Sequence, residues 1–164
     1  MILLHRSLLF SFALLTWMLA GAGSAAAGGS ESQTPDPRVA KGEAVLRALN
    51  NGKGQPVFEA MRRDFPFLAD ATAGYALGDV WSRQGLDTRT RQLAAMAAFG
   101  ALGLRPYFKT HAAYALNAGV PPDELKEIVY LITVPAGFPR AIEASQALQE
   151  LFVERGITSK SSSR

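Results

Sequence analysis

His111 is the residue best suited to proton-transfer chemistry in this 164-residue chain, which contains two histidines and no cysteine. Tyr107 lies four residues before it and Tyr114 three residues after it, so a helix would place the three rings on one face. Without a thiol, acid–base chemistry must use very few groups, and an imidazole titrates near neutral pH. The structural alternative is a core histidine held by a backbone carbonyl.

An arginine-rich segment, residues 86–93, precedes this histidine and supplies the second candidate. Asp87 is a suitable N-cap, so Arg89 and Arg91 fall in the first turn of a helix. A guanidinium can hold a carboxylate through two parallel N–H donors, which makes Arg91 a candidate for binding an organic anion. The alternative for Arg91 is a surface ion pair, and we expect Arg89 to face solvent.

Three aromatic residues, Trp81, Tyr107 and Phe138, are candidate walls of a pocket for a flat organic substrate. Aromatic side chains bury well with or without a ligand, so each of them could equally belong to the core. A lone histidine with scattered carboxylates supplies no cluster of metal ligands. We therefore expect neither a metal nor a cofactor.

The amino terminus has the layout of a secretory signal peptide over residues 1–27. A basic start precedes an apolar run from Leu8 to Ala20, and the small residues up to Ala27 offer an A-x-A-like cleavage site. The run is shorter than the roughly 20 residues of a membrane-spanning helix, which favours cleavage over a retained anchor. We expect a periplasmic or secreted protein with no stable membrane anchor after cleavage.

The rest of the chain divides into a linker, one domain and a tail. Residues 28–37 are rich in Gly, Ser and Pro and predict a flexible linker, residues 38–157 suit one domain, and residues 158–164 predict a disordered tail. The 17 Lys and Arg against 14 Asp and Glu form no basic cluster, so we expect no nucleic-acid partner. Without disulfides, burial or association between subunits must stabilise the fold.

Between linker and tail the pattern is helical throughout and predicts an all-α fold of about six to seven helices. Prolines open several of the expected helices, and glycines or the residue before a proline end them. The expected helices cover residues 39–49, 56–63, 67–82, 87–102, 106–117, 121–133 and 139–155.

Five segments of this region, in this order, resemble the carboxymuconolactone decarboxylase family. They are Val80–Leu93, Leu102–Gly103, His111–Gly119, Pro122–Val129 and Gly137–Ala141. The resemblance covers about residues 78–156 and implies an AhpD-like helical domain that assembles as a homotrimer or homohexamer.

The resemblance also implies roles for three residues. His111 matches the family's histidine and would deliver a proton, and Arg91 matches its helix-start arginine and would hold a carboxylate or lactone oxygen. Glu127 matches an acid that would orient the imidazole. A solvated charge on a helix face is an equal alternative for Glu127.

The superfamily contains two chemistries, and the sequence separates them. Peroxidase-type members carry a Cys-x-x-Cys pair and a glutamate, whereas here the paired positions hold Leu104 and Tyr107 and the glutamate position holds Gln92. A thiol peroxidase is excluded because there is no thiolate to act as nucleophile. The decarboxylase branch commonly has a tyrosine where this chain has Pro135, which removes a hydroxyl from the expected pocket rim.

The sequence therefore predicts an exported, cofactor-independent lyase that acts on a small carboxylated or lactone-type molecule. Loss of CO2 leaves negative charge delocalised through an unsaturated ring, so the site needs hydrogen-bond donors or a cation and an acid that protonates carbon. The alternative is a non-catalytic, oligomeric small-molecule-binding or accessory protein with the same fold.

Overall fold

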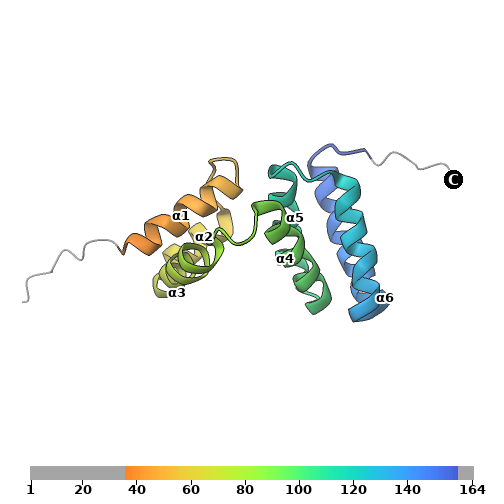
Figure 1. Cartoon of the computed structure of the whole chain (residues 1–164), viewed down its shortest axis with the longest axis horizontal. Coiled ribbons are helices and arrows are strands. Elements are labelled where there is room, and N and C mark those ends of the chain that lie inside the picture. Colours follow the sequence, from red (N-terminus) through yellow and green to blue (C-terminus); the bar gives the residue numbers. More distant parts are fainter. Residues whose placement is uncertain (1–35, 159–164) are drawn as a thin grey trace, which may run out of the picture. The chain divides into compact units, whose positions relative to one another are not determined.

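The structure is a computed structural model, and it describes residues 36–158. Within that range every regular element is a helix, which confirms the all-α prediction (Figure 1). None of these helices combines the length and the apolar character that crossing a membrane requires. The expected signal peptide, most of the linker and nearly all of the tail lie outside the described residues.

Local sequence explains where three of the first four helices begin. The four are α1 (Pro37–Leu49), α2 (Pro56–Asp64), α3 (Pro66–Ala71) and η1 (Thr72–Trp81). Each α-helix begins with a proline, whose fixed φ suits the first turn and whose missing N–H is not needed there. The Asp36 carboxylate accepts from the backbone N–H of Arg38 and caps α1, so this helix begins two residues before the predicted start at residue 39.

The η1 segment is a π-helix, whereas the sequence predicts one continuous α-helix over residues 67–82. Its backbone packs directly on α1, because glycines on both helices leave room. A Cβ atom on Gly42 would lie 1.9 Å from the carbonyl oxygen of Ala73, and one on Gly78 would lie 2.3 Å from the carbonyl oxygen of Arg38. Backbone contact this close requires glycine, and π-helical turns frequently occur at functional sites.

The remaining helices, α4 (Thr88–Leu102), α5 (Arg105–Asn117) and α6 (Pro122–Glu154), pack side by side (Figure 1). Asp87 caps α4 as predicted, since its carboxylate accepts from the backbone N–H of Thr90 at 2.6 Å. Gly103 ends α4 in the left-handed conformation, with φ 73°. Local signals therefore set both ends of the helix that carries the predicted arginines.

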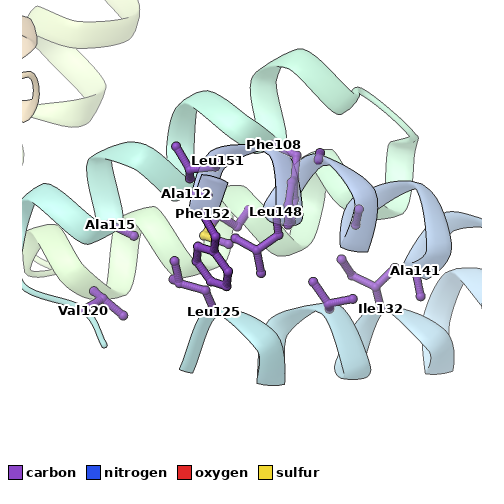
Figure 2. Packing of buried hydrophobic residues seen from close by; sticks show 14 residues of the cluster. Phe108, Ala112, Ala115, Val120, Leu125, Ile132, Ala141, Leu148, Leu151 and Phe152 are labelled. Carbon is purple, nitrogen blue, oxygen red and sulfur yellow. The ribbon is translucent and has the colours of Figure 1, made fainter. Parts of the chain in front are cut away.

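One hydrophobic core joins α4, α5 and α6. Its largest apolar side chains with almost no exposed surface are Met96, Phe108, Leu125 and Ile132. Figure 2 shows side chains of α5 and of both halves of α6 meeting between the helices. This packing fixes the face of α5 that the candidate histidine occupies.

Helix α6 covers the two helices predicted over residues 121–133 and 139–155. Gly137 breaks the helical geometry between them, with φ 80° and ψ 170°, and Pro135 and Pro139 flank it. The two predicted helices are therefore present as the two halves of α6, with the predicted turn at Gly137 between them.

Candidate active site

His111 lies on α5 with its ring partly buried, and one nitrogen is held by a neighbouring helix. The Nδ1 atom is 2.8 Å from the Oε1 atom of Gln92, a fully buried residue of α4. An amide oxygen can only accept, so Nδ1 carries the hydrogen and Nε2 keeps its lone pair. The hydrogen bond thus selects the tautomer that presents Nε2 as the proton-accepting atom.

Aromatic rings from three helices surround this imidazole. The ring of Phe99 stacks on it with centroids 5.0 Å apart, the Trp81 indole lies at 5.3 Å, and the Tyr114 ring meets it edge-on at 5.8 Å. Tyr107 stacks on Phe99 at 5.4 Å and is half exposed. Two of the three predicted pocket walls, Trp81 and Tyr107, therefore belong to this aromatic cluster.

The cluster keeps the imidazole neutral. Burial lowers the pKa of His111 from 6.5 to about 4, because the charged form would lose its hydration among apolar rings. The sequence predicts a pKa close to the ordinary value, and the surrounding aromatic rings are the reason for the difference. Burial also raises the pKa of Tyr114, and a hydrogen bond with Gln55 opposes that shift.

Two buried N–H groups of this cluster have no hydrogen-bond partner among the described residues. They are the indole Nε1 of Trp81 and the amide Nε2 of Gln92. A buried donor without a partner costs about 1–3 kcal/mol, so such a group needs an explanation. A ligand oxygen that accepts from these donors would supply one.

Arg91 is held by the segment that leads into α4. Its Nε atom donates to the carbonyl oxygen of Leu86 at 3.1 Å and its Nη2 atom to that of Arg83, so it holds the segment before α4. No hydrogen bond joins Arg91 to His111 within the described chain. Trp81 is near both residues. Its ring contacts the imidazole of His111, and it lines a groove together with Arg91.

The predicted site residues on α6 form no hydrogen bond, ion pair or ring contact with the imidazole within the described residues. Glu127 is exposed, and Gln92 is the residue that hydrogen-bonds the ring. Phe138 follows the break in α6 and is 73% exposed. Arg89 is half exposed as predicted and forms an ion pair with Glu124.

Sequence reasoning missed Gln92 and Phe99 as members of the cluster. Gln92 stood out only as the position where peroxidase-type proteins carry glutamate. The helical spacing of Gln92, Met96 and Phe99 could have placed them on one face of α4. Nothing in the sequence indicates that this face meets His111.

The sequence pattern described as the Carboxymuconolactone decarboxylase family matches residues 66–150, about half of the chain. The chain belongs to the carboxymuconolactone decarboxylase family. The resemblance drawn from the five segments is thus confirmed, and the matched range contains Gln92, His111 and all three rings around the imidazole.

Two proteins with sequence similarity extend this assignment. A 4-carboxymuconolactone decarboxylase of Acinetobacter baylyi is 39% identical over 83 residues, which cover 51% of this chain and 62% of that protein. The chain therefore spans less than two thirds of the length of this relative. An uncharacterised 15.0 kDa protein of Paracoccus denitrificans is 27% identical over 116 residues, covering 69% of this chain and 86% of that protein.

Proposed function

We propose that this member of the carboxymuconolactone decarboxylase family is a cofactor-independent carboxy-lyase that acts on a small carboxylated lactone. The observation that carries the proposal is the neutral, Gln92-oriented imidazole of His111 beside two buried N–H donors without partners. The name of the Acinetobacter baylyi relative supports the reaction class.

Loss of CO2 breaks a carbon–carbon bond and leaves its electron pair on the lactone ring. That pair delocalises onto the carbonyl oxygen, which then needs hydrogen-bond donors in a site of low polarity. The indole N–H of Trp81 and the free amide N–H of Gln92 are suited to this task. Hydrogen bonds from these donors stabilise a developing oxyanion more strongly among aromatic rings than they would in water.

The ring carbon must then be protonated, and His111 is the group suited to that step. A bound carboxylate favours the charged imidazole and raises its pKa, so Nε2 takes a proton from solvent when the substrate binds. The imidazolium gives this proton to carbon and becomes neutral again. One proton is consumed and one CO2 released per turnover, and Gln92 keeps the ring oriented throughout.

Assembly into a homotrimer or homohexamer and export across a membrane are further parts of the proposal. Exposed apolar side chains on both sides of the Gly137 break support the first: Tyr130 and Val134 before it and Phe138 and Ile142 after it are all more than half exposed. Exposed apolar surface of this kind commonly marks a subunit contact. Light scattering of the purified protein tests assembly, and cell fractionation tests export.

The decisive experiment incubates the purified chain with 4-carboxymuconolactone and measures CO2 release. We expect turnover that falls by about 100-fold or more in His111→Gln, the usual cost of removing a general acid. Gln149→Ala, at an exposed position of α6, is the matched control and should leave the rate unchanged. Binding of the lactone without any CO2 release would favour the non-catalytic alternative.

A further inference from the structure

A groove of about 600 Å³ lies between α1 and the segment that leads from η1 into α4. Its apolar wall comes from Ala44, Val45 and Ala48 of α1 and from Leu86 opposite. The volume is in the range of pockets that hold small organic molecules. The groove does not include His111 and shares only Trp81 with the aromatic cluster described above.

Three cations line this groove: Lys41, Arg83 and Arg91. Among the described residues none of the three pairs with a carboxylate, whereas ion pairs hold most of the other basic side chains. These paired residues are Arg38, Arg47, Arg62, Arg63, Arg89, Arg105, Lys109 and Lys126. The carboxylate that lines the groove, Asp87, is engaged as the cap of α4. The groove thus has an unneutralised positive charge.

Two hydrogen bonds to the backbone hold the guanidinium of Arg91 in place. The carbonyl oxygens of Leu86 and Arg83 accept two of its five N–H donors and fix the guanidinium plane. Three donors remain for a ligand, and a fixed guanidinium loses little side-chain freedom when it binds one.

Trp81 connects the groove with the imidazole. Its indole lines the groove, lies 5.3 Å from the His111 ring and carries one of the two buried N–H groups without a partner. A flat apolar body lying in the groove would contact this ring. Binding there would therefore change the surroundings of Trp81.

We propose that this groove binds a small aromatic or unsaturated carboxylate, with the carboxylate on Arg91, Arg83 and Lys41 and the apolar body against α1 and Trp81. The three cations without carboxylate partners and the apolar wall are complementary to such a ligand. The site goes beyond the proposed function, since it does not need turnover at His111.

The test uses the fluorescence of Trp81 in the full chain carrying Trp17→Phe, because the chain has only these two tryptophans. Sodium benzoate is the probe, and benzamide is its uncharged counterpart. We expect a saturable change with benzoate at concentrations about tenfold below those needed with benzamide. Arg83→Gln and Lys41→Gln should each weaken benzoate binding about threefold and leave benzamide binding unchanged.

Lys53→Gln and Arg140→Gln are the matched controls, since these cations also have no carboxylate partner in the described chain and do not line the groove. Equal affinities for benzoate and benzamide, or equal losses in control and groove variants, would overturn the proposal. The absence of saturable benzoate binding would also overturn it. Dissociation of an assembly by Ala44→Glu would then show that another subunit covers the groove. His111→Gln should keep benzoate binding, so failure of the decarboxylase assay and failure of this site are distinguishable.

Discussion

The buried imidazole of His111 makes the stability of the folded chain depend on pH. Its pKa falls from 6.5 to about 4 on folding, because burial disfavours the charged form. Between these two pH values the unfolded chain binds this proton and the folded chain does not. The stabilisation from a neutral His111 is therefore complete above about pH 6.5 and is lost as the pH falls toward 4.

The size of the effect follows from the two pKa values. A change from 6.5 to about 4 corresponds to a loss of about 3 kcal/mol in the free energy of unfolding. About 2 kcal/mol of this is lost between pH 7 and pH 5.

Urea unfolding at pH 7 and at pH 5 measures this quantity. His111→Gln removes the titrating group, and both proteins keep every carboxylate and the other histidine, so the difference between their pH dependences isolates His111. Both proteins are measured at the same protein concentration. We expect the free energy of unfolding to fall between pH 7 and pH 5 by about 2 kcal/mol more in the parent chain than in the variant. Equal losses in the two proteins would refute the idea that burial keeps this imidazole neutral.

Two further predictions concern residues around the site. Gln92→Glu places a carboxylate against Nδ1 of His111, so NMR titration of the imidazole should give a pKa well above about 4, and an unchanged value would contradict the hydrogen bond between them. Gly42→Ala puts a Cβ atom 1.9 Å from the carbonyl oxygen of Ala73, so thermal unfolding should show a loss of about 3 kcal/mol or more, as expected for overpacking. Gly54→Ala, whose Cβ atom would lie 3.5 Å from a flexible glutamate side chain, should be nearly neutral, and a similar loss in both variants would contradict the close packing of α1 on η1.

Helix boundaries were predictable because short-range chemistry sets them. The proline at the start of α2, the capping carboxylate of Asp87 and the positive φ at Gly119 act through neighbouring backbone atoms. The π-helical geometry of η1 was not predictable in the same way. The backbone of this segment packs against Gly42 of α1, more than thirty residues earlier in the chain.

The candidate site was predicted only in part. His111 and Trp81 were expected to belong to it, and the structure brings their rings together. Gln92 was missed as the partner of the imidazole, and Arg91 bonds to nearby carbonyl oxygens and forms no hydrogen bond with His111 within the described chain. Which side chains contact each other depends on how the faces of different helices pack together, and a local stretch of sequence does not specify that packing.

The amino-acid sequence by itself determined that the described chain is helical, that it has no thiol chemistry and that its resemblance is to the carboxymuconolactone decarboxylase family. These properties depend on residue type and on spacing over a few turns. Tertiary structure decided the tautomer and the lowered pKa of His111 and which N–H donors lack partners. The physical reason is that hydration and hydrogen-bond partners depend on packing between α4, α5 and η1, which no local stretch of sequence specifies.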